Sequence, residues 1–473
     1  MNMENKKKRN KNIWKFWQQR RYILTFMLML GQAIMFTIRV NMSIAIIPMT
    51  TNFTNDKNAL KQGAAFEWNP KEQGIILSSF FYGSVVTQLP GGVLSKRFNG
   101  VKLYGAAICV ASFLSVCTPL AQGFYSMVIV RTLQGLFLGV TFPTQMSIIS
   151  QWAPSDERAR MTMFSNSGLY FGTVVALQFS GIISRWMGWT SVFYIFGVIG
   201  LIWYAIWLKI IRESPEKDRR ITAEEKQLIL SSIGDRITRN IHIPWLQILT
   251  SVPVWALIVA HFTHCWLAYT LLAHMPRFFS QILNLQISEI GFVSSLPYLV
   301  NGCLSSFSGL LADKLLSKKV LTLVQTRKLF TCGSFLMQSI LLFCITMFMG
   351  SWSNVVFLIT TVCFSNLVMT GFWINFIDIA PQFSGILFAI SNTIATVSGI
   401  ISPTLTGILI QNENIEDWKK VFLISAAVCL FGSIFYGITA SGVVQPWAKV
   451  QSQDETLDKI NSRKNSSAIT PDV

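Results

Sequence analysis

Two arginines, Arg39 and Arg131, lie within long apolar stretches of the sequence and are the first candidates for chemistry. An unpaired charge at the centre of a bilayer costs between roughly 2.5 and 17 kcal/mol, so such a residue is a functional candidate by default. For Arg131, which lies about two turns inside its stretch, reaching water by snorkelling is a more serious alternative. Guanidinium groups match the geometry of carboxylates and phosphates. Two of them facing one cavity would form a site for a small anion.

Further polar residues lie at similar depth. Gln32 and Ser43 share the helical face of Arg39, which predicts a polar stripe that lines a cavity. Hydrogen bonds between helices explain the other polar residues nearly as well as substrate binding does. Those that we include as candidate binding residues are Tyr82, Asn375 and Asn392.

Three of the four histidines, His261, His264 and His274, fall in one apolar stretch, with Tyr269 nearby as a further candidate binding residue. His264 could titrate near neutral pH and supply a conditional positive charge. The adjacent Cys265 raises the alternative of a metal site. No convergent third ligand is evident, so no metal site is predicted.

The composition indicates which elements must position these residues. The chain has 473 residues, of which 51% are hydrophobic and 13% charged, which is typical of a membrane protein. A bilayer requires roughly 20 apolar residues per helix, and twelve such runs are present. They begin near Tyr22, Gln73, Lys102, Ser126, Arg160, Gly188, Val252, Glu289, Arg327, Ser353, Ser384 and Trp418.

Basic residues predict the orientation. The segment before the first run carries Lys6, Lys7, Lys8, Arg9, Lys11, Lys15, Arg20 and Arg21. The positive-inside rule places this segment in the cytosol, and an even number of spans returns the C-terminus there. The first run is too long for a signal peptide, so we expect a retained helix. Much of the formal net charge of +17 then comes from basic residues that set the orientation in the membrane and attract anionic lipid. We therefore expect no nucleic-acid partner.

A polar segment divides the chain into two halves. We predict a basic N-terminus (1–21), a six-helix bundle (22–211), a cytosolic central loop (212–250), a second six-helix bundle (251–441) and a cytosolic tail (442–473). Thr222 and Glu225 form a predicted capping box that opens a short helix through Leu230. A repeated helix end, GGVLSK (91–96) and GLLADK (309–314), suggests pseudo-twofold halves. The predicted fold class is therefore an all-α membrane protein with twelve transmembrane helices in two pseudo-symmetric bundles.

Charged residues near the predicted cytosolic helix ends are candidates for gating and coupling. Asp313 lies in the second copy of the repeated helix end, where the first copy has Ser95 instead of an acid. This difference suggests that the two gates are not equivalent. Asp378, near the end of the tenth run, is assigned to the same role, as are Glu157 and Arg158 in the loop before the fifth.

These features resemble the major facilitator superfamily, and within it the anion transporters that include sialin, the vesicular glutamate transporters and the sodium-phosphate cotransporters. The resemblance covers about Arg21 to Trp447, and sialin looks closest. The blocks that support it are IRVNMSIAI (38–46), SSFFYGSVVTQLPGG (78–92), RTLQGLFLGVTFP (131–143), WAPSDER (152–158), GFVSSLPYL (291–299), NFIDIAPQFSGIL (375–387) and VQPWA (444–448).

The resemblance also implies roles for single residues. It implies that Arg39 handles substrate, and it places His264 where the glutamate transporters have a substrate-binding arginine. Sialin-like members have glutamates at the positions of Gln134 and Leu138, and the glutamate transporters have one at the second. Proton coupling through that site is therefore in doubt. Leu77 stands where the glutamate transporters have a histidine, which lowers the rank of vesicular glutamate transport.

Together these features predict secondary transport of a small organic or inorganic anion by a monomer, coupled to H⁺ or Na⁺ and using no cofactor. A sodium-dependent phosphate cotransporter, an uncoupled anion channel and a transport-dead receptor remain alternatives. No nucleotide-binding fingerprint or catalytic motif is present, so we expect neither ATP-driven transport nor an enzyme. The membrane is lysosomal, vesicular or plasma membrane, and glycosylation of the sequon at Asn52 is left open.

Overall fold

The computed structural model describes residues 19–50, 65–154, 157–233 and 243–448. The Asn52 sequon, most of the basic N-terminus and most of the tail lie outside these ranges. The first half contains α2 (Arg20–Thr50), α3 (Pro70–Arg97), α4 (Gly100–Cys117), η2 (Thr118–Leu120), α5 (Phe124–Leu138), α6 (Thr141–Trp152), α7 (Arg158–Met187) and α8 (Trp189–Ile210). The second half contains α11 (Val252–Ile282), α12 (Ile287–Ser317), α13 (Leu323–Met347), α14 (Ser353–Ile379), α15 (Ser384–Leu409) and α16 (Ile415–Thr439).

These helices confirm the predicted spans. With α5 and α6 joined into one span, each predicted start lies within four residues of an observed helix start. Ten described helical spans are long and apolar enough to cross a membrane. The other two predicted spans correspond to α3 and α12, which are 28 and 31 residues long. Both helices contact the opposite half, with α3 packing against α15 and α12 against α7.

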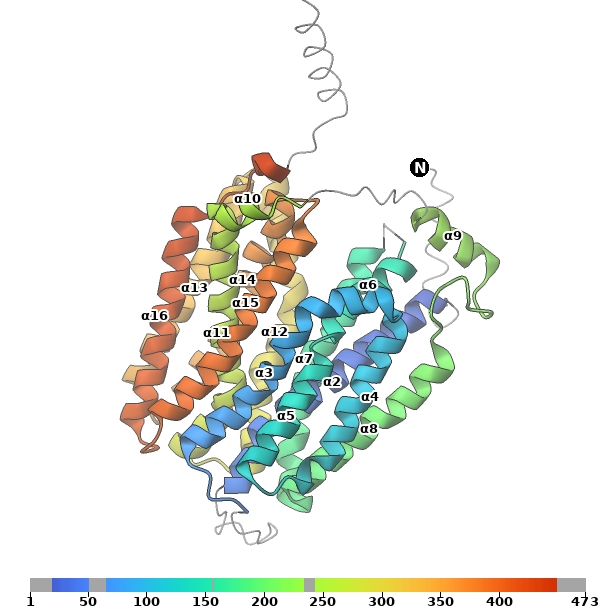
Figure 1. The fold of residues 1–473 in the computed structure, drawn as a ribbon. Helices are drawn as coiled ribbons and strands as arrows, with labels where there is room; N and C mark the ends of the chain where they lie inside the picture. The colour runs from blue at the N-terminus through green and yellow to red at the C-terminus, as the bar shows by residue number, and fades with distance from the viewer. Residues whose placement is uncertain (1–18, 51–64, 155–156, 234–242, 449–473) are drawn as a thin grey trace, which may run out of the picture.

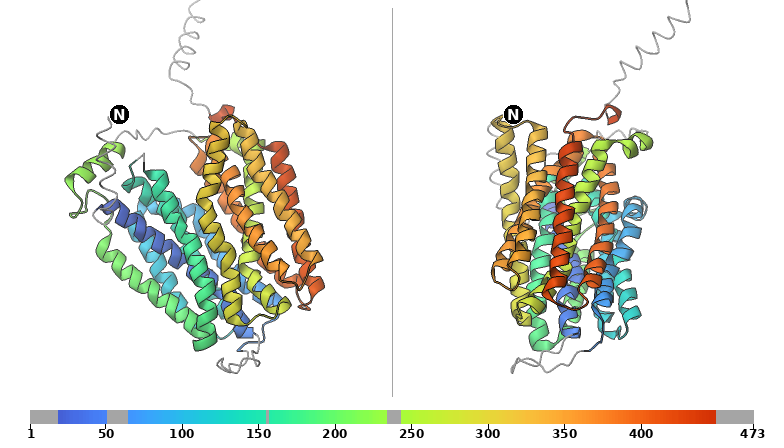
Figure 2. Two further views of the ribbon diagram at one scale, coloured as in Figure 1. Left: turned by 180° about the vertical axis from the view of Figure 1, so that it is seen from behind. Right: turned by 90° about the vertical axis from the view of Figure 1, so that its left-hand side faces the viewer.

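The two halves lie side by side as two helical bundles (Figure 1). The short helices α9 (Ala223–Ile233), α10 (Trp245–Thr250) and η3 (Pro446–Ala448) lie at the end of the molecule where α2 begins, which we call the terminal face. We call the other end the far face. The ribbons of the two halves diverge toward the terminal face and converge toward the far face, as the reverse view also shows (Figure 2).

Glycines allow the two halves to meet closely near the far face. A Cβ atom added to Gly74 of α3 would lie 2.7 Å from the Pro403 carbonyl oxygen and 3.1 Å from the Gly407 Cα of α15. On the other side, a Cβ added to Gly181 of α7 would lie 3.2 Å from the Gly291 Cα of α12. Gly92, at the terminal end of α3, has nothing within 4 Å of its Cβ position. Close packing between halves at these glycines is thus confined to the far face.

The part of the central loop up to α9 is attached to the first half. Thr222 accepts the Glu225 backbone N–H at 3.3 Å, as predicted. The Glu225 carboxylate, however, does not complete the predicted capping box. It accepts the backbone N–H groups of Arg20 and Arg21, at 3.0 and 3.1 Å, and so caps α2 instead. The free backbone N–H groups at the start of a helix favour a nearby carboxylate. The Glu225 carboxylate, which belongs to α9, binds those of α2.

Two arginines strengthen this attachment, which we call the clasp (Arg20, Arg21, Glu157, Asp218 and Glu225). Arg20 forms a 2.8 Å ion pair with Asp218, and Arg21 pairs with Glu157 at 2.8 Å and with Glu225 at 3.2 Å. The side chains are at most 10% exposed. Helix α10 belongs instead to the second half, because Ile248 is buried with Val254 and Leu257.

Candidate functional site

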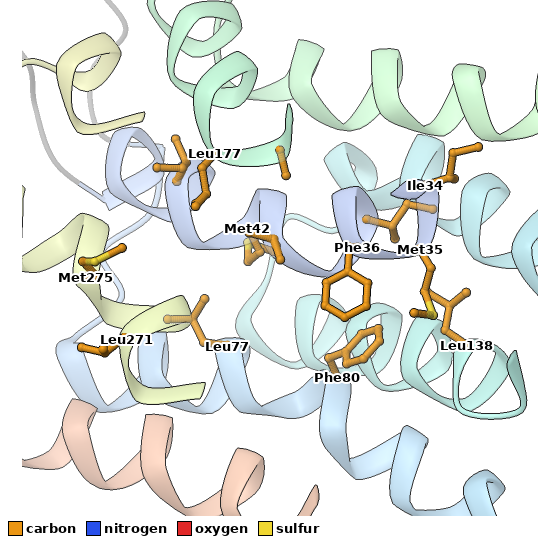
Figure 3. Packing of buried hydrophobic residues seen from close by; sticks show 14 of the residues in the cluster. Ile34, Met35, Phe36, Met42, Leu77, Phe80, Leu138, Leu177, Leu271 and Met275 are labelled. Atoms are coloured by element: carbon orange, nitrogen blue, oxygen red, sulfur yellow. The ribbon is translucent and has the colours of Figure 1, made fainter. Parts of the chain in front are cut away.

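Helix α2 places the candidate site in the middle of the molecule. Most of its residues are buried, including Gln32 and Ser43. In Figure 3 its apolar side chains pack against residues from α3, α5, α7 and α11, so both halves surround it. A helix that is apolar on nearly every face is expected at such a position. Arg39 is therefore held between the two bundles.

The Arg39 guanidinium lies among aromatic rings. Its central carbon is 4.6 Å from the ring centroid of Phe81, 4.8 Å from that of Tyr269, 5.3 Å from Phe36 and 5.4 Å from Phe80. Phe81 comes from the first half and Tyr269 from the second, and their rings are 4.6 Å apart. Rings at these distances attract a cation but do not accept its hydrogen bonds fully. The Nε and Nη2 groups of Arg39 are buried without a hydrogen-bond partner in the described structure.

Arg131 has different surroundings, because both of its terminal nitrogens are hydrogen-bonded, although its Nε is buried without a partner among the described residues. One terminal nitrogen donates to the Ile38 carbonyl and to Gln134, each at 2.9 Å, and the other donates to the Arg39 carbonyl at 2.8 Å. Arg131 therefore fastens α5 to the turn of α2 that presents Arg39. The guanidinium also lies 5.5 Å from the Phe80 ring.

Two cavities adjoin Arg39. The far-side cavity is lined by Arg39, Val40, Ser43, Leu77, Phe80, Phe81, Arg131, Tyr269, Leu272 and Ala273. The terminal-side cavity is lined by Met35, Arg39, Phe80, Phe81, Ser84, Gln88, Leu138, Gly139, Phe142, Tyr269 and Thr396. Arg39, Phe80, Phe81 and Tyr269 line both cavities, so they form the layer between them. The predicted polar stripe reaches this site through Ser43 and Arg39.

The terminal-side cavity has a polar wall that the sequence did not predict. Gln88 of α3 accepts hydrogen bonds from Asn392 at 3.2 Å and from Thr396 at 3.1 Å, both on α15. These bonds join the two halves beside Arg39. Ser84 and Gln88 lie four residues apart and so share one face of α3. This spacing is the feature of the sequence from which the polar wall could have been predicted.

The other candidate binding residues lie away from both cavities. The Tyr82 hydroxyl lies 3.1 Å from the Ser78 hydroxyl, which accepts a hydrogen bond from Thr404 of the other half at 2.9 Å. Asn375 donates to the Tyr436 hydroxyl within the second half at 2.9 Å.

His264 is also absent from the residues that line either cavity. Its ring centroid lies 6.0 Å from that of Phe372, within the second half. Among the described residues, no group of three His, Cys, Asp or Glu side chains could hold a metal ion.

The candidate gating residues form contacts within their own halves. Glu157 belongs to the clasp and also accepts a hydrogen bond from Tyr22 at 3.2 Å. Asp378 forms a 2.7 Å ion pair with Arg327. Ser95 is buried and donates to the Gly92 carbonyl at 2.8 Å. The gating role of these residues stays a prediction.

Two further gating candidates are less defined. Arg158 approaches the Ser150 and Ala153 carbonyls, each at 3.5 Å, at the start of α7. Asp313 lies in α12, but its side chain is not among those that the structure describes.

Comparisons with known proteins agree with this architecture. Residues 22–403 match the model of the Major Facilitator Superfamily. Vesicular glutamate transporter 2.1 of Danio rerio is 42% identical over 439 residues, covering 91% of this chain and 75% of the relative. Vesicular glutamate transporter 2 of Homo sapiens is 40% identical over 445 residues, covering 92% of this chain and 76% of the relative.

A solved structure shares the fold at low sequence identity. The bacterial homologue of the human lysosomal transporter Spinster, in an inward-facing and occupied conformation, superposes with a TM-score of 0.70 at 13% identity. The superposition covers 91% of this chain and 99% of the other.

Proposed function

The chain belongs to the major facilitator superfamily and, within it, to the anion:cation symporter family, and from this premise we propose that it is a secondary transporter of small organic or inorganic anions. It works by alternating access of a central site to the two sides of the membrane. The observation that supports this proposal is Arg39, a half-buried cation between the two halves whose Nε and Nη2 atoms are buried without a partner among the described residues. An anion in either cavity would supply the missing acceptors.

The terminal face is the cytosolic one in this proposal, because the positive-inside rule assigns the basic N-terminus to the cytosol. The divergence of the two halves at that face then corresponds to a state open to the cytosol (Figure 1). Closing it requires the halves to tilt about the site, which separates the glycines near the far face. We expect the protein in a lysosomal, vesicular or plasma membrane.

The substrate is an acidic sugar, an acidic amino acid or phosphate, and H⁺ or Na⁺ supplies the gradient. The sialin-like assignment rests on the sequence blocks, whereas the relatives described above bear the name of vesicular glutamate transporters. Leu138 lines the terminal-side cavity and cannot titrate. If protons drive uptake, another group must therefore bind them, and His264 is our candidate.

Uptake into proteoliposomes tests the proposal. Labelled sialic acid, glutamate and phosphate are each supplied under an imposed proton gradient and separately under a sodium gradient. We expect saturable uptake of at least one anion, lost in Arg39→Ala and retained in Arg219→Ala, which changes an exposed arginine outside the transmembrane helices. Uptake that is equal in the two variants would contradict the proposed site.

The main alternative is a sodium-dependent phosphate cotransporter, which the non-titrating Gln134 and Leu138 favour. Sodium-driven phosphate uptake without sialic acid or glutamate uptake would establish it. An uncoupled anion channel would instead give a current that does not saturate and that follows the membrane potential alone.

A further inference from the structure

We propose that Gln88 is a specificity-determining residue that donates to the second polar group of the transported anion. The site then favours anions whose second group accepts hydrogen bonds, such as a carbonyl, an N-acyl group or a hydroxyl. It disfavours anions that carry an ammonium group there. This inference rests on the proposed function, since it concerns the same site.

The amide of Gln88 has a fixed orientation. Its carbonyl oxygen accepts a hydrogen bond from the Asn392 side-chain nitrogen at 3.2 Å, and it lies 3.1 Å from the Thr396 hydroxyl, whose single proton it shares with the Asn392 backbone carbonyl at 2.7 Å. The amide nitrogen has two donors and no hydrogen-bond partner among the described residues, although Gln88 lines the terminal-side cavity. Because the carbonyl end is held by α15, the amide nitrogen is the end left for a ligand.

The charged residues that line the cavities also disfavour a ligand with an ammonium group. Neither set of described lining residues contains an aspartate or a glutamate, whereas both contain Arg39 and one also contains Arg131. Leu138 contributes only apolar surface to the terminal-side cavity. An ammonium group there would face a like charge and no carboxylate among the described lining residues, while the Arg39 guanidinium and the Gln88 amide nitrogen offer only donors.

Asn392 is thereby a positioning residue, since it acts on a ligand through Gln88. The sequence predicted it as a direct binding residue. The alternative role of Gln88 is purely structural, as a link between α3 and α15. A structural link would affect stability and overall transport, but not the order in which ligands bind.

Binding to the purified full-length protein separates these roles. The shift of the thermal-unfolding midpoint is titrated with N-acetylglutamate, glutamate and glutarate, which share two carboxylates and differ in bearing an N-acyl group, an ammonium group or neither. We expect N-acetylglutamate to bind at least threefold more tightly than glutarate and at least tenfold more tightly than glutamate. Comparison with glutarate removes the effect of net charge.

Two variants and a control complete the test. Gln88→Leu should remove the preference for N-acetylglutamate over glutarate, and Gln88→Glu should raise the affinity for glutamate relative to N-acetylglutamate by tenfold or more. Gln227→Leu, on the exposed face of α9, should leave all three affinities unchanged. The unfolding midpoint without ligand shows whether each variant is folded.

The outcomes distinguish the two proposals. If binding depends on Arg39 but the order of the ligands is the same in wild type, Gln88→Leu and Gln88→Glu, the role of Gln88 is refuted and the proposed function stands. If no ligand binds, or if binding survives Arg39→Met, the proposed anion site fails and the inference fails with it.

Discussion

At the scale of single residues, two arginines that look alike in sequence, the half-buried Arg39 and the buried Arg131, have different surroundings. Arg39 faces aromatic rings and two cavities, whereas Arg131 donates to the Ile38 and Arg39 carbonyls. A guanidinium with unpartnered donors is destabilising unless a ligand satisfies it. The unpartnered donors of Arg39 therefore lower the stability of the folded protein at the position where they are needed for binding.

This contrast predicts opposite effects on stability. Arg39→Met should abolish uptake and raise the free energy of unfolding by about 1–3 kcal/mol, because it removes unsatisfied buried donors. Arg131→Met should also impair uptake but lower that free energy by about 1–3 kcal/mol, because it detaches α5 from α2. Thermal unfolding in detergent, measured alongside uptake, checks both. Equal changes in the two variants would show that the hydrogen bonds of Arg131 do not matter.

Leu138 permits a test of proton coupling. In Leu138→Glu, a carboxylate beside Arg39 would compete with the anion whenever it is ionised, so anion affinity should fall as pH rises and recover as pH falls. Leu138→Gln has nearly the same shape as the glutamate variant but does not titrate, and it should show no added pH dependence. Binding measured between pH 5.5 and 7.5 compares the two. A glutamate variant with the same pH profile as the glutamine variant would mean that position 138 cannot couple protons to anion binding.

The sequence was enough to predict Arg39 as a candidate functional residue, because placing a charge in an apolar transmembrane helix costs much free energy. It could not show that Arg131 donates to backbone carbonyls, since that depends on how α5 packs against α2. Gln88 was missed for the related reason that its importance arises from Asn392 and Thr396, which are distant in sequence.

At the scale of helices, the glycine contacts near the far face set how closely the halves approach. Gly74→Ala would place a methyl group against the Pro403 carbonyl and the Gly407 backbone. Overpacking of this kind costs about 1–3 kcal/mol, which is enough to shift a two-state equilibrium by roughly tenfold. We therefore expect Gly74→Ala to favour the state that is open at the far face.

Spin labels at Lys71 and Gln411, in a background without the native cysteines, would measure the separation of α3 and α15 near that face. The Gly74→Ala variant should show a larger population at long distance than the parent protein. Gly92→Ala lies on the same helix but meets nothing within 4 Å, and its distances should match the parent. Unchanged distances in both variants would mean that the Gly74 contact does not limit closure.

The clasp predicts a stability effect that is specific to one of two neighbouring glutamates. Glu225→Ala removes the cap of α2 and leaves Arg21 with one fewer partner, so the free energy of unfolding should fall by about 1–3 kcal/mol. Glu224→Ala, an exposed change in the same helical turn, should be nearly neutral. Thermal unfolding compares them, and equal midpoints would show that the buried ion pairs contribute no net stability.

Hydropathy predicted the positions of the helices well, because each span must satisfy its own backbone in a bilayer. Local patterns were less informative about the partners of a helix end. The spacing of Thr222 and Glu225 fits a capping box, yet the Glu225 carboxylate accepts hydrogen bonds from the backbone N–H groups at the start of α2. Only the folded arrangement brings that second helix start within reach.

At the scale of the whole molecule, the repeated helix ends predicted two related bundles, and the comparisons confirm the fold. The sequence could not indicate which face is open, because both states of an alternating-access protein must be compatible with one sequence. The divergence of the two halves at the terminal face describes the one conformation that the structure shows.

The attachment of α9 to the first half and of α10 to the second also limits the movement. Only roughly ten peptide units join Ile233 to Ile243, and a fully extended chain of that length spans at most about 36 Å. The clasp fixes one end of this connection to the first half, and the packing of Ile248 fixes the other end to the second half. The connection is therefore a tether with a fixed maximum length. It sets an upper bound on how far the terminal ends of the halves can part, and shortening it should slow transport without changing what the site binds.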